Sequence, residues 1–458
     1  MSEETMTPPP RLTPPALSKL VQDGEIHSVL VGVPDMRGAL KGKIVNAAHF
    51  LAQQGFGLEM CKYVLATDVD MNPQRGYPLT GWHEGFSDLR VTPDMSTLRR
   101  LSYLPGTVLA LGDAFHPDGR PVEVAPRQIL SDQLQQLADL GLTAKVGVES
   151  EFMLYQGTPA QARRSGYREL TPVSPYNLDY ALDHPPVLSA FFNDLQRAMT
   201  VADCPVEAIK TEGAAGQVEV TWPYGDPVRA CDTYAFHKHA VRPLAEQHGL
   251  APTFMAAPQT GVGSGMHLHV SLWRDEQPVF AARRHGELSE LMQHSIAGLL
   301  CGLPFMAPLY APTRNSYRRF TPHSFAPTSF LWGRDNRSCA IRVAGHHANT
   351  HLESRLAGAD ANPYLALAAT IASIIYGIRN KPKLPSPCTG DAYETLAPHR
   401  RIPSSLDEAL TPFVDSPIVR AAFGSDVAGH YLHAGEIECA AAADEVTDVE
   451  LRRGFDRA

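Results

Sequence analysis

The segment VGVESEFMLY places two glutamates inside a run that otherwise has the composition of a buried strand. Glu149 and Glu151 are flanked on both sides by valine, phenylalanine and leucine. Burying an unpaired carboxylate is strongly unfavourable, so two acids in a core strand need partners. Because residues i and i+2 of a strand face the same way, these carboxylates are expected to project side by side. The apolar flanks argue against a strand face exposed to solvent.

Polar pairs recur on other strand-like segments, each next to a loop of small residues or to another polar pair. A lone glutamate or histidine is more often structural than catalytic, but several such pairs on apolar runs favour a common site. The further pairs are Glu212 and Glu219 in TEGAAGQVEVTW, His267 and His269 in GSGMHLHVSL, and Glu353 and Arg355 in HLESR.

Five of these glutamates and one histidine form a set of hard ligands, which suits Mg²⁺ or Mn²⁺ better than Zn²⁺ or copper. Six side chains are too many for one Mg²⁺, which usually keeps several waters, so two metal ions are expected. Guanidinium groups match phosphate and carboxylate geometry, and metals facing arginines are typical of phosphoryl transfer. The chain has no Walker A motif and no kinase signature. The candidate arginines lie in the single segment TRNSYRRFTPHSFAPTSFLWGRDNRSCAIRV and are Arg318, Arg319, Arg337 and Arg342.

Composition limits the other function classes. The net charge of -9 gives no electrostatic footprint for nucleic acid. Seven scattered cysteines without a CxxC pair, and an N-terminus without a secretory signal, predict reduced thiols in a cytoplasmic protein. The apolar run ANPYLALAATIASIIYGI is short for a membrane span and contains Asn362 and Pro363, so a buried helix is expected.

The chain length of 458 residues favours two domains, and the mixture of strand-like and helix-like segments favours an α+β fold. We expect a disordered proline-rich tail over residues 1–20, an N-terminal domain over 21–120 and a second domain over 121–458. The segment HSVLVGVPDMRGALKGKIV predicts two strands with a turn between Asp35 and Gly38. The segment PRQILSDQLQQLADLGL predicts a helix that stops near Gly141.

Six motifs together resemble the type I glutamine synthetase family, in that family's order and over most of the chain: ESEF, EGAAGQVE, GSGMHLH, NSYRRF…AP, NRSCAIRV and LESR…ANPYLA. The resemblance implies an N-terminal β-grasp domain and a catalytic domain built on an antiparallel sheet with helices. It also implies a homododecamer of two hexameric rings with active sites between subunits. The reaction that it implies uses ATP to make γ-glutamyl phosphate, which an amine then attacks.

The resemblance implies roles for individual residues, taken motif by motif. The first metal ion would be held by Glu151, Glu212 and Glu219, and the second by Glu149, His267 and Glu353. The two acids of the VGVESEFMLY strand would then each face a different cation. The implied ATP contacts are His269, Ser271 and Arg342, with Tyr224 as a stacking residue. Arg337 would steady the transferred phosphoryl group. The glutamate site would comprise Arg319, Arg355 and the backbone of Gly263.

The flap after the arginine segment departs from the pattern of true glutamine synthetases. There, a glutamate closes over the site and helps to take a proton from ammonium; here the flap reads HSFAP, with Phe325 at that position. A phenyl ring cannot accept a proton, but it can pack against the carbon skeleton of a larger amine. The flap resembles the branch that makes γ-glutamyl amides of polyamines or ethanolamine. Alternatively, Phe325 only seals the flap against water.

Other features of the ammonium site are partly kept. Asp35, in VPDMRG, resembles an aspartate that a neighbouring subunit contributes and that would deprotonate the amine, and Tyr180 resembles another residue of that site. Asp35 could equally be a turn residue, because Asp-x-x-Gly is common in turns. Val262 replaces the asparagine usual before GSGMH, which leaves the acid substrate open.

The sequence therefore predicts an ATP-dependent ligase that joins glutamate to ethanolamine or a polyamine, with Mg²⁺ or Mn²⁺. The alternatives are a glutamine synthetase that uses ammonium and a catalytically silent relative.

Overall fold

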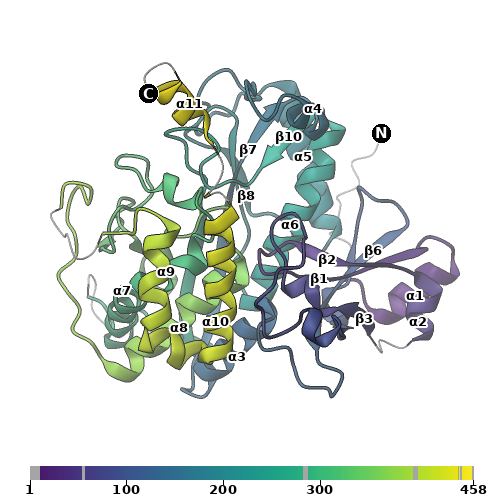
Figure 1. Ribbon diagram of the computed structural model, residues 1–458, viewed down its shortest axis with the longest axis horizontal. Helices are drawn as coiled ribbons and strands as arrows, with labels where there is room; N and C mark the ends of the chain where they lie inside the picture. Colours follow the sequence, from purple (N-terminus) through teal and green to yellow (C-terminus); the bar gives the residue numbers. More distant parts are fainter. Residues whose placement is uncertain are drawn as a thin grey trace.

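The computed structural model describes residues 11–53, 57–281, 287–395, 401–441, 443 and 446–455. In the described part the chain forms an N-terminal sheet and a larger sheet, with most of the helices packed around the larger one (Figure 1). This arrangement confirms the predicted α+β class.

The N-terminal sheet is mixed, with the order β2-β1-β6-β4-β3 and a short β5 that also pairs with β6. The central pair β1 and β6 is parallel, and the neighbouring pairs are antiparallel. The predicted hairpin is confirmed: its two strands pair from Ser28 opposite Asn46 to Pro34 opposite Leu40. The elements are α1 (Pro14–Gln22), β1 (Ser28–Pro34), β2 (Leu40–Asn46), α2 (Ala47–Ala52), β3 (Leu58–Cys61), β4 (Asp88–Pro93), β5 (Arg99–Arg100) and β6 (Thr107–Phe115).

The prediction of a disordered tail over residues 1–20 is wrong in its second half, and residues 1–10 lie outside the described part. Thr13 caps α1 by accepting a hydrogen bond from the Ala16 amide, and the helix begins at Pro14. Proline is tolerated in the first turn of a helix because the amide lost there has no helical partner. Leu17 is fully buried, so packing against the domain fixes the helix.

The larger sheet has the order β13-β14-β15-β11-β7-β9-β8, with β10 on β7 and β12 on β11. All of its pairs are antiparallel except β13 with β14. The strands are β7 (Thr143–Gln156), β8 (Ala208–Thr211), β9 (Gln217–Thr221), β10 (Leu250–Thr253), β11 (Met266–Arg274), β12 (Gln277–Pro278), β13 (Trp332–Arg334), β14 (Ile341–Ala344) and β15 (His351–Ser354).

Most of the helices that follow β6 pack on this sheet or on one another (Figure 1). They are α3 (Pro126–Ala138), α4 (Pro159–Arg164), α5 (Pro186–Val201), α6 (Pro227–Gln247), α7 (Glu290–Tyr310), α8 (Pro363–Asn380), α9 (Leu406–Asp415), α10 (Pro417–Ala441) and α11 (Asp448–Gly454). The predicted helix after residue 125 is α3, and Gly141 beyond its end has a φ of +69°.

The apolar run near residue 370 is the buried helix α8, as the sequence predicts. It crosses α7 closely: a Cβ at Gly377 would lie 2.1 Å from the carbonyl oxygen of His294, and one at Gly298 would lie 2.3 Å from that of Ser373. Glycine on both helices therefore allows their backbones to touch. Among the described residues, no helix is long and apolar enough to cross a membrane.

A buried arginine links the N-terminal sheet to the helices of the larger domain. Arg127, on α3, donates from Nε to Asp232 Oδ1 on α6 at 3.1 Å and from Nη1 to Asp113 Oδ1 on β6 at 2.6 Å. Tyr364 on α8 donates to the same Asp232 oxygen at 2.6 Å. A hydrogen-bonded charge network of this kind is strongly destabilised when one member is removed, so it fixes the N-terminal sheet against the helices.

Candidate active site

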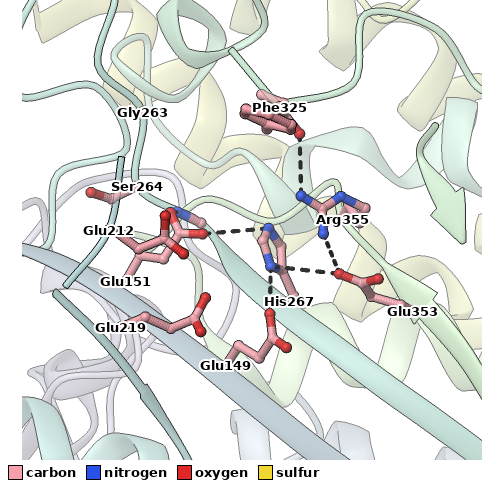
Figure 2. A network of polar contacts seen from close by, with 12 residues as sticks. Glu149, Glu151, Glu212, Glu219, Gly263, Ser264, His267, Phe325, Glu353 and Arg355 are labelled. Atoms are coloured by element: carbon pink, nitrogen blue, oxygen red, sulfur yellow. Dashed lines mark hydrogen bonds and ion pairs between the residues drawn. The ribbon is translucent and has the colours of Figure 1, made fainter. Parts of the chain in front are cut away.

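Strand pairing brings the polar pairs of the sequence onto one region of the larger sheet (Figure 2). On β7, Glu149 lies opposite His267 of β11 and Glu151 lies opposite Glu219 of β9. On β15, Glu353 lies opposite His269 of β11 and opposite Arg342 of β14. The paired residues therefore project from one face of the sheet, as the i, i+2 spacing predicts, and the antiparallel register places the pairs beside one another.

Two groups of these side chains have ligand atoms close enough to share a metal ion. Within each group the ligand atoms lie within 4.8 Å of one another, and the groups are Glu151, Glu212 and Glu219, and Glu149, His269 and Glu353. The first group is the one predicted. The second contains His269 where the sequence predicts His267, although His267 Nδ1 also lies 2.8 Å from Glu149 and 3.7 Å from Glu353.

The electrostatics of the groups favour added positive charge. Burial and the nearby carboxylates of Glu149 and Glu151 raise the pKa of Glu219 far above its usual value. Burial works in the same direction at Glu149, but hydrogen bonds from His267 and His269 outweigh it and hold the pKa of Glu149 well below its usual range. Carboxylates gathered this closely are stabilised by a cation, and oxygen-rich groups suit Mg²⁺ or Mn²⁺. The donor sets therefore fit divalent metal ions.

One cavity, here called the aromatic cavity, has a volume of about 420 Å³. It contains three of the four predicted ATP contacts: Tyr224, His269 and Ser271. Trp273 donates from its indole Nε1 to Ser271 Oγ at 2.9 Å, and the ammonium of Lys145 lies 3.7 Å from the centre of the Trp273 ring. Flat aromatic walls with a few fixed polar groups suit a nucleotide base.

A second cavity, here called the charged cavity, has a volume of about 580 Å³. Glu149 lines both cavities, so the second candidate metal group lies at their junction. The predicted residues on this side are Glu151, Tyr180, Glu212, Glu219, Gly263, His267, Phe325, Arg337, Arg342, Glu353 and Arg355. Arg342, predicted as an ATP contact, thus lines the charged cavity and not the aromatic one.

The arginines divide into those that face the charged cavity and one that supports it. Arg342 donates from Nη1 to Glu353 Oε2 at 2.9 Å, and Arg355 pairs with the other oxygen of Glu353. Arg337 is exposed at the cavity. Arg319, a predicted glutamate contact, is buried outside the cavity lining and donates to the carbonyl oxygens of Arg355 and Leu356, each at 3.2 Å. It therefore holds the residues that directly follow β15 in place.

The glycine-rich loop before β11 must pass close to Arg319. A Cβ at Gly263 would lie 2.8 Å from Arg319 Cγ, and one at Gly265 would lie 2.7 Å from His267 Nε2. The Gly263 carbonyl accepts from Gln217 Nε2 at 2.8 Å and lines the charged cavity. Only glycine permits this approach, which presents backbone groups to the cavity.

Two exposed aromatic side chains stand at the mouth of the charged cavity. Phe325 is 66% exposed and Tyr180 is 71% exposed, and both have left-handed backbones, with φ of +59° and +56°. The Phe325 carbonyl accepts from Arg355 Nη2 at 3.3 Å, and the next carbonyl, of Ala326, accepts from the Tyr393 hydroxyl at 3.1 Å. Bulky residues rarely adopt such backbones, which are concentrated at functional sites.

Asp35 lies away from both cavities. Its Oδ1 accepts from the amides of Arg37 and Ala39, each at 2.9 Å, and its side chain is buried within the hairpin turn. In this chain Asp35 is thus the turn residue that the sequence allowed as an alternative. A part in catalysis at a neighbouring subunit stays a prediction.

Sequence reasoning missed several residues that line the cavities. Lys210 lies on β8, two residues before Glu212, and lines the charged cavity. Trp273 lies on β11, two residues after Ser271, and lines the aromatic cavity. The same i, i+2 rule that grouped the acids would have placed both on the functional face. Asp179 and His323 lie in loops, where no such periodicity applies.

Comparisons with known proteins identify the family of the chain. The model of the glutamine synthetase catalytic domain matches residues 123–454. The chain belongs to the glutamine synthetase family. It is 41% identical over 450 residues to gamma-glutamylethanolamide synthetase GlnA4 of Streptomyces coelicolor, with 97% of each chain covered. It is 32% identical to a glutamate–isopropylamine ligase of a Pseudomonas species, with 95% of this chain and 96% of the relative covered.

The fold is also found in solved structures. The structure of a GmaS complex with ADP has a TM-score of 0.81 and 24% sequence identity, and covers 96% of this chain and 99% of that one. The chain is thus an ADP-forming glutamate–amine ligase of the glutamine synthetase family, ammonia counted among the amines. Ligases of this family use ATP and divalent metal ions.

Proposed function

We propose that this chain joins the γ-carboxylate of L-glutamate to a primary organic amine through γ-glutamyl phosphate, releasing ADP and phosphate. Phe325 carries the proposal, because it puts a phenyl ring at the charged cavity where a proton acceptor for ammonium would stand. Two similar relatives carry the names of an ethanolamide synthetase and an isopropylamine ligase. Both names specify organic amines.

The first step transfers the γ-phosphoryl group. A γ-carboxylate oxygen of glutamate attacks the γ-phosphorus of ATP, and the bond to the bridging oxygen of ADP breaks. Tyr224 and Ser271 hold the nucleotide in the aromatic cavity, while Arg337 and Arg355 offset negative charge from the charged cavity. Mg²⁺ or Mn²⁺ at the two candidate groups would supply the positive charge that the phosphates need.

The second step forms the amide. The free amine attacks the acyl carbon, the carbon–oxygen bond to phosphate breaks, and the nitrogen loses a proton. Glu212 lines the charged cavity and is the proton acceptor that we assign within this chain. Asp35 of a neighbouring subunit is the second candidate base, and it acts only in an assembly.

The first experiment is phosphate release by the purified protein with ATP, Mg²⁺ and L-glutamate. Each reaction adds one amine: ammonium, methylamine, ethanolamine, isopropylamine or putrescine. Mass spectrometry identifies the product. Turnover with an organic amine and little with ammonium supports the proposal.

The other outcomes separate the alternatives. Strong turnover with ammonium alone would make the chain a glutamine synthetase with an altered flap. Silence with every amine, together with failure to bind ATP and Mn²⁺, would favour a catalytically silent relative. Silence with intact ATP binding would direct attention to Val262 and to another acid substrate.

The proposal includes assembly into a homododecamer. Ile44 on the edge strand β2 is 76% exposed, and Trp82 in the loop before β4 is 77% exposed, so the N-terminal sheet offers apolar surface to another subunit. Mass photometry should give twelve times the chain mass of 49.9 kDa. A monomer that turns over at full rate would contradict the assembly and the part of Asp35 in catalysis.

A further inference from the structure

A lysine that the mechanism does not use occupies one end of the charged cavity. Lys210 contacts the Glu212 carboxylate, and its Nζ lies 3.6 Å from Asp179 Oδ1 and 3.9 Å from Glu219 Oε1. The same ammonium lies 4.5 Å from the centre of the Tyr180 ring. Its side chain is only 22% exposed. Lys210 is therefore a tethered cation among the acids nearest to the mouth of the cavity.

The acids of this cavity already have partners within the chain. Every acid that lines it has a polar partner among the described residues. One set faces histidines, arginines or amide N–H groups, and the other faces Lys210. The first set is Glu149, Glu151 and Glu353, and the second is Asp179, Glu212 and Glu219.

Binding of a substrate amine with a second positive charge depends on Asp179. Of the acids described in this lining, it is the one outside the two candidate metal groups, so it is the natural partner for a second ammonium on a substrate. Lys210 already faces it. Whether or not Glu212 and Glu219 bind a metal ion, Lys210 keeps Asp179 and the Tyr180 ring as partners. A second substrate cation would meet a like charge where it needs an acid.

We propose that Lys210 selects monoamines whose remaining atoms are uncharged and rejects diamines and longer polyamines. The inference rests on the proposed function and names the substrate class of that site. The exposed rings of Tyr180 and Phe325 give the neutral part of the amine an apolar surface to pack against. Lys210 is thus a specificity-determining residue, and ethanolamine or a small alkylamine fits where putrescine does not.

The test compares two amines that share one carbon chain, n-butylamine and putrescine, with saturating ATP and glutamate. In the natural protein kcat/KM for n-butylamine should exceed that for putrescine by about 10-fold or more. Lys210→Met removes the charge and keeps the length of the side chain, so it should narrow this ratio by about 10-fold, mainly through KM for putrescine. Lys210→Arg keeps the charge and should keep the ratio. Lys19→Met, on the exposed face of α1, is the matched control for a lost lysine charge and should leave the ratio unchanged.

Because Lys210 touches candidate metal ligands, a second readout is needed. Binding of Mn²⁺, followed by its electron paramagnetic resonance signal, reports any change in metal affinity separately from amine selection. If Lys210→Met abolishes turnover, calorimetry with a non-hydrolysable ATP analogue and glutamate replaces it. Putrescine should then bind more tightly to Lys210→Met than to the natural protein, and equal binding would overturn the inference.

The failures of the two proposals can be told apart. Equal efficiency of the natural protein with both amines, or an unchanged ratio in Lys210→Met, would overturn the role of Lys210 and leave the ligase function standing. No turnover of the natural protein with any organic amine would overturn the proposed function and this inference with it.

Discussion

Side chains of the aromatic cavity come largely from regular strands, whereas several of the charged cavity come from loops. His269, Ser271 and Trp273 alternate along β11 on the aromatic side. Tyr180 and Phe325 on the charged side have left-handed backbones, as does His323; none of the described residues lining the aromatic cavity is a non-glycine residue in that region. Regular strands thus fix the side to which we assign the nucleotide, while loops shape the side to which we assign the amine.

This difference predicts which substitutions change nucleotide binding and which change amine choice. Strand positions are held by a ladder of hydrogen bonds and by the core behind it, so a change there disturbs the whole sheet. Loop positions tolerate substitution, and binding specificity is often carried by loops on a rigid scaffold. We therefore expect variants of the aromatic cavity to alter ATP binding alone, variants of the charged cavity to alter amine choice, and variants at the junction to lower turnover with every amine.

The largest effect is expected at the junction. Glu149→Gln removes a charge from the group with His269 and Glu353 and from the wall that the two cavities share. We expect kcat to fall by about 10³-fold with every amine, because one group that stabilises transition-state charge supplies a factor of that order. Mn²⁺ binding should weaken in parallel. Glu59→Gln, on the exposed surface of β3, is the control. Activity within about 10-fold of the natural protein would exclude Glu149 as a ligand.

A change of substrate preference is expected at the flap. Phe325→Glu puts a carboxylate at the mouth of the charged cavity, where Phe325 is 66% exposed and an added charge stays hydrated. We expect the ratio of kcat/KM for ammonium to that for ethanolamine to rise by about 10-fold.

Phe325→Leu tests whether the ring matters only as an apolar seal. It should lower kcat/KM for ethanolamine modestly and leave ammonium a poor substrate. If Phe325→Glu and Phe325→Leu have the same amine profile, the flap position does not select the amine. The expectation that variants of the charged cavity alter amine choice would then be wrong at this position.

A smaller effect, on nucleotide binding alone, is expected from substitutions in the aromatic cavity. Tyr224 is 58% exposed, so a stacked base would cover a face that is now open to solvent. Tyr224→Ala should raise KM for ATP by about 10-fold, the factor that corresponds to a stacking contact of roughly 1–1.5 kcal/mol. Tyr224→Phe keeps the ring and should behave like the natural protein. A changed amine profile in Tyr224→Ala would contradict the separation of the two sides.

Local periodicity predicted the pairs on the strands of the site well. Alternation along β7 and β11 puts Glu149 beside Glu151 and His267 beside His269, and alternation is a property of the strand alone. The pairing of Glu149 with His267 joins strands 118 residues apart. No local rule contains that register, and only the resemblance to a family indicated it.

The misses have physical causes of the same kind. The sequence predicts disorder at the start of α1 because prolines in a polar segment suit both a helix N-terminus and an extended tail. The burial of Leu17 decides for the helix. Arg319 and Arg355 look equivalent in sequence, yet packing turns the first toward backbone carbonyls and the second toward the charged cavity. Lys210 looks like a solvated charge until β8 is paired with β9.

The smallest effect is expected on stability, from a histidine behind the sheet. His237, on α6, is fully buried beside the rings of Phe152, Trp222 and Phe254, and burial lowers its pKa from 6.5 to about 3. Above pH 6.5 the histidine is neutral in both the folded and the unfolded state, so it adds no pH dependence to stability. As the pH falls from 6.5 toward 3, the unfolded chain takes up a proton that the folded chain refuses, so stability is lost across that window.

His237→Phe removes this proton uptake and keeps an aromatic ring in the apolar setting. The fall in melting temperature between about pH 7 and about pH 5 should therefore be smaller in the variant than in the natural protein. It should not vanish, because burial also lowers the pKa of His430 to about 4. His83→Phe, at an exposed position, should keep the full pH dependence. If His237→Phe and the natural protein lose the same stability on acidification, His237 does not resist protonation in the folded state. The apolar layer behind the aromatic cavity is then not rigid, and rigidity cannot explain the difference between the aromatic and the charged cavity.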